Sequence, residues 1–170
     1  MKRFLLMLVV AFTAMAASAQ IYVGGELGFW HDDDAVPENV FTLAPGVGYE
    51  LNENWAVGGN LMLSFQKDVK NVYGIEPYAR WSYFKNGMVR LFLDMGVGIG
   101  ITDPEVGDNK TGWNIGVKPG IALHLTDHFS ILAKAGFLGY ADDYISEKYD
   151  NGFGFNVNGE TLTFGIEYTF

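Results

Sequence analysis

The sequence predicts an all-β fold, an eight-stranded antiparallel up-and-down transmembrane β-barrel preceded by a cleavable signal peptide. Three observations lead to this prediction. An apolar segment with a basic start opens the chain, eight later segments alternate apolar residues with others, and the connections between those segments are alternately short and long. Alternation with a period of two is typical of β-strands, whereas a period near 3.6 is typical of helices.

The N-terminus has the three parts of a secretory signal peptide. Two basic residues precede a short apolar run, 4–12, and an A-x-A cleavage site ends at Ala19. The run is too short to cross a bilayer as a helix, which needs about 20 apolar residues. We therefore predict a signal peptide at 1–19, and the β-barrel domain, which the residue patterns described below place in the outer membrane, at 20–170.

Composition excludes several classes of function. The 170-residue chain has a formal net charge of −9 and no cysteine. Nucleic-acid binding needs a basic face, so an acidic chain of this kind is not expected to bind nucleic acid. The lack of cysteine excludes disulfides and thiolate metal sites. We expect an exported protein without a cofactor.

Eight segments of the predicted domain alternate with a period of two. They span 21–30, 40–51, 55–66, 72–84, 88–101, 111–125, 129–141 and 160–170. The fifth shows the pattern best, because a large apolar residue occupies every second position of 90–101 and glycine occupies three of the positions between. Each segment therefore predicts a strand with one apolar face.

The connections alternate in length, as in outer-membrane barrels. The short ones are 52–54, 85–87 and 126–128, and the longer ones are 31–39, 67–70, 103–110 and 142–159. An even strand number then places both termini on the short-turn, periplasmic side, with the longer loops outside. A turn at 85–87 also predicts a register in which Arg80 lies opposite Phe92 and is a diagonal neighbour of Asp94.

The composition of the two faces predicts which one meets lipid. Glycine gathers on the minor face, where it weakens a solvated strand but leaves room in a cramped lumen. Aromatic residues of the apolar face form two rims, as two bilayer interfaces require. The rim near the short turns is Tyr49, Trp55, Trp81, Tyr83, Phe129, Tyr168 and Phe170, and the rim near the loops is Phe29, Phe41, Phe65, Tyr73, Trp113 and Phe137. A soluble lipocalin-like barrel with an inward apolar face is the alternative.

Three prolines conflict with regular strand pairing. Pro45, Pro77 and Pro119 lie inside predicted strands, and a closed barrel has no edge strand to receive them. Each proline removes a donor from the ladder, so the sequence predicts either a β-bulge or a locally opened ladder at each position.

Three stretches carry a resemblance to a known family. They are the signal ending "ASAQ" (17–20), the hairpin "PGVGYELNENWAVGG" (45–59) and the ending "FGIEYTF" (164–170). The chain resembles the small eight-stranded outer-membrane β-barrel family, the porin-like "outer membrane protein beta-barrel domain" common in Bacteroidetes. The resemblance implies the bacterial outer membrane as the location. It also implies that Tyr168 and Phe170 act as an assembly signal for the barrel-assembly machinery.

Charged residues on the minor face predict the content of the lumen. They are Glu26, Glu50, Glu76, Arg80, Arg90, Asp94, Lys118, His124, Lys134 and Glu167. Because acids and bases nearly balance and eight strands leave little free lumen, we expect a hydrogen-bonded plug. The alternative is a path for ions or protons.

Other candidate sites are weaker. The acidic first loop could hold a divalent cation through Asp32, Asp33, Asp34 and Glu38, although it lacks the ligand order of an EF-hand and a solvated acidic loop is the simpler interpretation. Ser130 and His124 suggest a Ser–His pair, but at the periplasmic end, far from the outer leaflet that a lipid A-modifying enzyme would act on. The loop 142–159 either protrudes as a hairpin that binds an extracellular protein by strand addition or folds over the barrel mouth.

The sequence therefore predicts a non-enzymatic integral outer-membrane barrel, closed and with a structural or surface-interaction role. Its expected partners are outer-membrane lipid, lipopolysaccharide and the barrel-assembly machinery. A narrow porin-like channel for small solutes is the main alternative, and a lipid A-modifying enzyme is a third.

Overall fold

The computed structural model describes residues 21–31, 39–66, 70–104, 108–144, 151–157 and 162–170. The strands are β1 (Ile21–His31), β2 (Asn39–Glu50), β3 (Trp55–Gln66), β4 (Lys70–Asn86), β5 (Val89–Pro104), β6 (Lys110–His124), β7 (Phe129–Lys134), β8 (Phe137–Asp142), β9 (Gly152–Asn156) and β10 (Thr163–Thr169). Among these described residues, no helix has the length and apolar character needed to cross a membrane.

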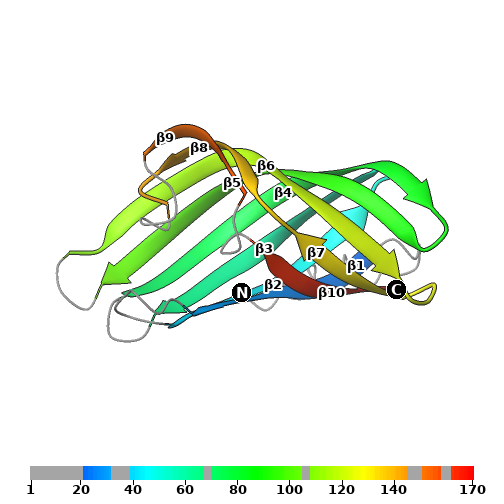
Figure 1. Ribbon diagram of the computed structural model, residues 1–170, viewed down its shortest axis with the longest axis horizontal. Coiled ribbons are helices and arrows are strands. Elements are labelled where there is room, and N and C mark those ends of the chain that lie inside the picture. Colours follow the sequence, from blue (N-terminus) through cyan, green and yellow to red (C-terminus); the bar gives the residue numbers. More distant parts are fainter. Residues whose placement is uncertain (1–20, 32–38, 67–69, 105–107, 145–150, 158–161) are drawn as a thin grey trace, which may run out of the picture.

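Eight of the strands close into an antiparallel barrel. Strands β1 to β6 pair in sequence order, β6 pairs with β7, β7 with β10, and β10 with β1. Figure 1 shows the strands tilted around a common axis, with the short turns at one end, called here the turn end, and the longer connections at the other, the loop end. The predicted eight-stranded up-and-down barrel is confirmed.

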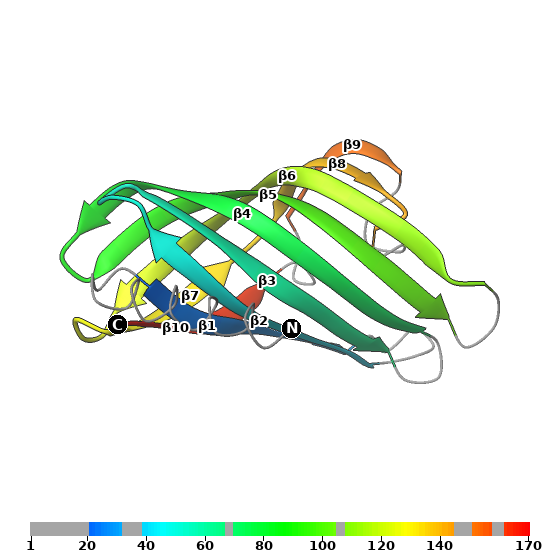
Figure 2. The ribbon, with the colours of Figure 1, turned by 180° about the vertical axis from the view of Figure 1, so that it is seen from behind.

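The predicted seventh strand, 129–141, is divided into two strands, β7 and β8. A further strand, β9, forms within the predicted loop 142–159. Near the loop end β8 replaces β7 as the partner of β6, and β9 pairs with β8. In both ribbon views this hairpin lies beside the loop-end half of β6 (Figures 1 and 2).

The division of the seventh strand reverses the faces of its second half. Strand β6 is paired through Gly120↔Lys134 and then Val117↔Leu138, so the β7–β8 side contains one extra residue. Gly136, with a φ of 85°, lies at the break. A one-residue slip exchanges the two faces of a strand. The prediction that Phe137 belongs to the outer aromatic rim is therefore wrong, because its side chain is only 3% exposed and faces the lumen.

The prolines open the ladder on one side only. Each keeps a partner on the preceding strand, in the pairs Pro45↔Gly25, Pro77↔Gly59 and Pro119↔Leu93. On the other side the β2–β3 and β4–β5 ladders are interrupted at Pro45 and Pro77 and resume in unchanged register. Beside Pro119, β7 ends and β8 takes over. A locally opened ladder, rather than a bulge, accommodates Pro45 and Pro77.

The register of the β4–β5 hairpin differs from the prediction. Asn86 pairs with Val89, so the turn has two residues, and Gly87 adopts a φ of 57° in it. A β-bulge between Ser82 and Phe84 adds a further shift. Arg80 consequently lies directly opposite Asp94 and not opposite Phe92. The predicted three-residue turn at 85–87 is wrong. The predicted register is wrong with it, because turn length sets the register of a hairpin.

Both described ends of the barrel chain meet at the turn end. The Phe170 N–H donates to the Ile21 carbonyl over 3.0 Å, and the Thr169 N–H donates to the His128 carbonyl over 2.8 Å. Figure 2 shows the C-terminus beside the start of β7. At the same end, a side chain stabilises each of the turns β2–β3 and β6–β7. Asn52 Oδ1 accepts the N–H groups of Asn54 and Trp55, and Thr126 Oγ1 accepts those of His128 and Phe129.

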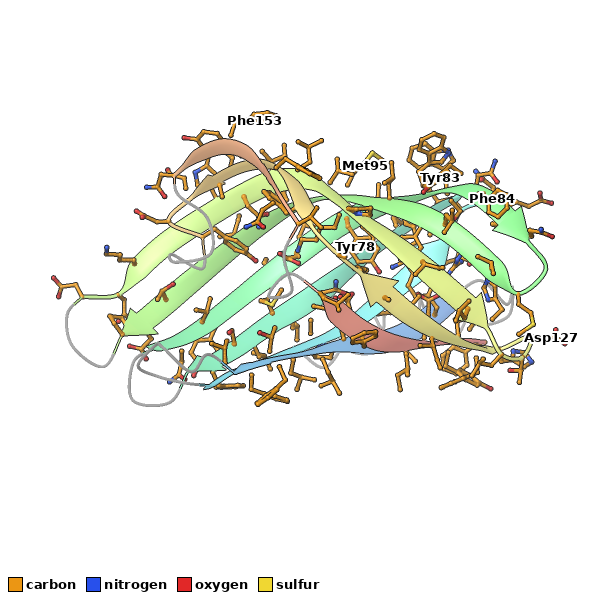
Figure 3. The ribbon with its side chains drawn as sticks, in the orientation of Figure 1. Tyr78, Tyr83, Phe84, Met95, Asp127 and Phe153 are labelled. Atoms are coloured by element: carbon orange, nitrogen blue, oxygen red, sulfur yellow. The ribbon has the colours of Figure 1, made fainter. Side chains whose placement is uncertain are left out.

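The outer face of the barrel is apolar, and the inner face carries the polar groups. On β5 the outward residues Val97, Ile99 and Ile101 are 38–52% exposed, whereas the inward Phe92 and Asp94 are buried. Figure 3 shows the same division around the barrel, with Met95, Tyr83 and Phe153 pointing away from it and Tyr78 lying inside. This is the reverse of a soluble barrel, which would bury its large apolar side chains.

Candidate functional site in the barrel lumen

Inward aromatic rings rest against glycines of neighbouring strands. A Cβ atom added at each glycine would meet the ring of its partner, in the pairs Tyr22 with Gly48, Tyr78 with Gly58, Phe92 with Gly120, Phe137 with Gly116, and Tyr144 with Gly98. Glycine is otherwise unfavourable inside a strand. The glycine-rich minor face is therefore the space that these rings fill.

Arg80 is at the centre of the polar contacts in the lumen. Its Nε and Nη2 donate to the two carboxylate oxygens of Asp94 over 2.7 and 3.0 Å, and its Nη1 donates to Glu167 Oε2 over 2.7 Å. The three side chains are at most 4% exposed. Paired, bidentate contacts of this kind are the arrangement in which a buried guanidinium is best stabilised.

The contacts continue from Arg80 in two directions. On one side Arg90 donates to Glu167 over 2.8 Å and to Glu50 over 3.1 Å. On the other side Lys134 contacts Asp94 over 2.7 Å and donates also to Glu26. We call the seven connected residues the lumen network: Glu26, Glu50, Arg80, Arg90, Asp94, Lys134 and Glu167. Glu50 lies at its outer end, with about a third of its side chain exposed.

Aromatic rings enclose the Arg80 guanidinium. Its Cζ lies 4.2 Å from the ring centre of Phe92, and 5.5 and 5.4 Å from those of Tyr22 and Tyr78. Contacts within about 6 Å of a ring face are attractive for a cation. The two tyrosine hydroxyls are hydrogen-bonded to each other over 3.1 Å. Within the described part of the chain, Arg90 Nε is the only buried side-chain nitrogen or oxygen without a hydrogen-bond partner.

A second group of contacts lies nearer the loop end. Lys118 Nζ donates to both carboxylate oxygens of Glu76, over 2.9 and 2.8 Å, and the Tyr144 hydroxyl donates to Glu76 Oε1 over 2.9 Å. We call Glu76, Lys118 and Tyr144 the upper cluster. Tyr144 comes from the segment after β8 and is only 2% exposed, so this segment reaches into the lumen.

Little free volume remains beside Arg80. A cavity lined by Tyr22, Tyr78 and Glu167, among others, measures about 10 Å³. This is room for about one water molecule. Side chains therefore fill the lumen around Arg80, as expected for eight strands.

His124 lies apart from these two groups. Its Nδ1 is 2.8 Å from Ser130 Oγ, at the turn end, and Ser130 is 3% exposed. A serine nucleophile must be reachable by its substrate and oriented through its histidine by a third group. Ser130 is buried among strands, so the geometry is that of a cross-strand hydrogen bond between β6 and β7.

The remaining predicted sites have separate outcomes. The first-loop residues Asp32, Asp33, Asp34 and Glu38 lie outside the described residues. Elsewhere in the described ranges no group of three or more His, Cys, Asp or Glu side chains could hold a metal ion. The rings of Tyr168 and Phe170 lie edge to face, 5.2 Å apart, on the outer face at the turn end. Their role as an assembly signal remains a prediction.

The aromatic rings of this site were not predicted from the sequence. Tyr22, Tyr78, Phe92 and Tyr144 were not among the predicted lumen residues, although the first three lie on minor-face positions. The glycines of the neighbouring strands were the available signal, because an inward glycine on one strand makes space for a large ring on another.

Comparison with solved structures supports the fold. The chain is similar to Neisserial surface protein A (NspA; 13% identity, TM-score 0.60, covering 88% of this chain and 97% of that one). It is similar also to the N-terminal β-barrel domain of Pseudomonas aeruginosa OprF (11%, 0.60, 89% and 98%). A third relative in structure is Ail, the attachment invasion locus protein of Yersinia pestis, solved with the heparin analogue sucrose octasulfate (18%, 0.54, 89% and 97%). No curated protein sequence matches the chain.

The family is shown by sequence. A family model described as "Outer membrane protein beta-barrel domain" matches residues 4–170, nearly the whole chain. The barrel, its apolar outer face and its charged lumen agree with this match. The chain therefore belongs to the outer membrane protein β-barrel domain family and is an integral protein of the bacterial outer membrane.

Proposed function

We propose that the protein is a closed outer-membrane barrel with a structural and surface-interaction role, and that it neither conducts solutes nor catalyses a reaction. The observation that carries this proposal is the filled lumen. The lumen network and the enclosing rings leave a cavity of only about 10 Å³ around Arg80. A solute path would need these ion pairs to separate, and separating a buried ion pair is costly.

The upper cluster supports closure from the loop end. Tyr144 is buried and its hydroxyl is bound to Glu76, so a side chain of the segment after β8 takes up part of the lumen above the network. Side chains that occupy the lumen at two depths make a narrow channel for small solutes a poorer explanation of the lumen than a plug.

We propose that Ser130 and His124 do not act as a catalytic pair, because of where they lie in the barrel. Ser130 is buried and lies at the turn end, the end that we propose faces the periplasm, as short turns do in outer-membrane barrels. An enzyme acting on outer-leaflet lipid would need its nucleophile near the opposite end.

We propose lipid and lipopolysaccharide as the partners of the outer face. The side chains of the β8–β9 hairpin continue the apolar surface of β6, since Ile115 pairs with Tyr140 and Tyr140 with Phe153. Figure 3 shows Phe153 pointing away from the barrel. The barrel-assembly machinery, acting through Tyr168 and Phe170, and an extracellular protein partner at 142–159 belong to the same proposal. A sulfated ligand of the kind bound to Ail is disfavoured here by the net charge of −9.

A liposome-swelling assay tests the proposal. Purified, folded protein is reconstituted into liposomes, which are diluted into an isotonic solution of a small sugar such as arabinose. We expect swelling no faster than in protein-free liposomes, because the plug leaves no path for the sugar. Swelling that increases with the amount of protein, as a general porin gives in parallel, would contradict it.

Migration in gels of heated and unheated samples provides the folding control. A folded barrel is expected to migrate differently before and after boiling, so an absence of swelling can be assigned to a folded, inserted protein.

A further inference from the structure

The turn between β6 and β7 holds the end of the last strand. The Thr169 N–H of β10 donates to the His128 carbonyl over 2.8 Å. The Thr169 carbonyl in return accepts the Nδ1–H of the His128 imidazole, also over 2.8 Å. The imidazole ring stacks on Tyr168, with the ring centres 5.8 Å apart and the planes inclined by 26°. We call these three contacts the His128 clasp, which lies where Figure 2 shows the C-terminus beside the start of β7.

The side chain of His128 takes the place of a backbone donor. Two residues that form a hydrogen-bonded pair in an antiparallel ladder each donate an N–H to the other. The His128 N–H is used within the turn, because it donates to Thr126 Oγ1 over 3.3 Å. The imidazole N–H therefore supplies the second bond to Thr169. It extends the pairing of β7 with β10 by one residue beyond Tyr168↔Phe129.

The strand that the clasp holds is short. Of the eight strands that close the barrel, β7 and β10 are the shortest, with six and seven residues. β10 forms six residue pairs with β7 and six with β1, whereas β1 and β2 form eleven. Inside the lumen Glu167 holds β10 to Arg80 and Arg90, and the clasp holds its end.

Thr169 lies between the clasp and the seam, our name for the pairing of β1 with β10. It pairs with Tyr22 across the seam, and the next residue, Phe170, donates its N–H to the Ile21 carbonyl over 3.0 Å. The seam joins residues separated by nearly the whole described chain, whereas His128 and Thr169 are 41 positions apart. A contact between residues nearer in sequence closes a smaller loop at a lower cost in entropy, so it is expected to form earlier.

From these observations we propose that the His128 clasp forms before the seam and positions the end of β10 for barrel closure. The N–H and carbonyl of Thr169 both bind His128, so β10 offers its other edge to β1 in the register Tyr22↔Thr169. A frayed end could meet β1 in a shifted register, and a slip of one residue would turn Glu167 out of the lumen. This inference goes beyond the proposed closed barrel, because it concerns how the barrel closes and holds whether or not the lumen conducts.

Pulsed hydrogen exchange during folding of the wild-type protein tests the order of events. Unfolded protein in urea is diluted into lipid vesicles, labelled at increasing times and transferred to detergent micelles for NMR. The Thr169 N–H reports on the clasp, and the Phe170 N–H reports on the seam. We expect the Thr169 amide to become protected before the Phe170 amide. Equal rates, or earlier protection of Phe170, would overturn the proposal.

Three substitutions of the exposed His128 side chain test its role. His128→Ala removes both ring and donor, His128→Asn keeps a donor, and His128→Phe keeps a ring without the donor. Closure is followed by excimer fluorescence of pyrene attached to Leu27→Cys and Phe164→Cys, a pair across the seam on the outer face of a chain that has no other cysteine. We expect His128→Ala to slow closure about 2- to 10-fold, the range for losing one hydrogen bond, and His128→Asn to restore most of the rate.

The unfolding rate separates positioning from simple stabilisation. A contact made before closure changes the rate of closure, whereas a contact made afterwards changes mainly the rate of unfolding. We expect the unfolding rate of His128→Ala to stay within about 2-fold of the wild-type rate. Faster unfolding with unchanged closure would overturn the proposal, and so would recovery of closure in His128→Phe but not in His128→Asn.

Discussion

Replacing Arg80 with methionine is expected to lower the free energy of unfolding by about 3–5 kcal/mol, the usual cost of removing one partner of a buried ion pair. Arg80 is 2% exposed and binds both Asp94 and Glu167, so its loss leaves two buried carboxylates with fewer partners. Urea unfolding of the folded protein in lipid vesicles, followed by tryptophan fluorescence, measures the effect.

Two variants serve as controls for Arg80→Met. Arg80→Lys keeps the charge but cannot form the bidentate contact with Asp94, so its loss should be intermediate. Lys118→Met removes a cation that is 29% exposed, where water can replace part of the lost contact, and should cost less than Arg80→Met. Equal stability of Arg80→Met and wild type would show that the lumen network does not hold the barrel together.

Replacing Gly120 with alanine is expected to cost about 1–3 kcal/mol, the range for overpacking a filled core. The added Cβ would lie 2.6 Å from Cε2 of Phe92, a ring that is fully buried beneath Arg80. The ring cannot retreat without disturbing the guanidinium above it. The same urea titration measures this loss, and a lowered midpoint with an unchanged slope would assign it to stability alone.

Gly154→Ala is the matched control for Gly120→Ala. Gly154 also lies in a strand, β9, but an added Cβ there would meet no atom within 4 Å. We expect its unfolding midpoint to stay close to that of the wild type. Similar losses at both positions would mean that the cost comes from the strand backbone and not from the Phe92 ring.

The strands and their outer face could be predicted because the pattern that sets them is local. Along β5 the apolar residues Val97, Ile99 and Ile101 alternate with glycines, and a period of two fixes which residues share a face. The same rule located the charged residues that meet in the lumen. No interaction between distant residues is needed for either result.

The turn at 126–128 gave the observed pairing of His124 with Ser130, but the register of β4 with β5 and the facing of β8 could not be predicted, because these depend on single residues at turns and breaks. The two-residue turn after Asn86 and the bulge near Ser82 place Arg80 opposite Asp94 instead of Phe92. At Gly136 one extra residue turns Phe137 inward, although the alternation of the strand before it predicts the outer face. Alternation along one strand does not reveal an inserted residue, because the insertion is defined only by the pairing with the neighbouring strand.

The upper cluster could not be predicted for a different reason. Tyr144 follows β8, in a stretch that the sequence indicates only as a long loop, and its side chain reaches glycines on two other strands, β4 and β5. The glycines on β5 signal that something large fills the lumen beside them, but nothing in their spacing identifies which residue does so.

Recording from a planar lipid bilayer tests the closed lumen most directly. Folded wild-type protein is added to a bilayer in concentrated KCl, with a general porin as the positive control. Because ion pairs and rings fill the lumen around Arg80, the current is expected to stay at the level of the protein-free bilayer. Steady current steps of uniform size that become more frequent as protein is added would contradict the closed barrel.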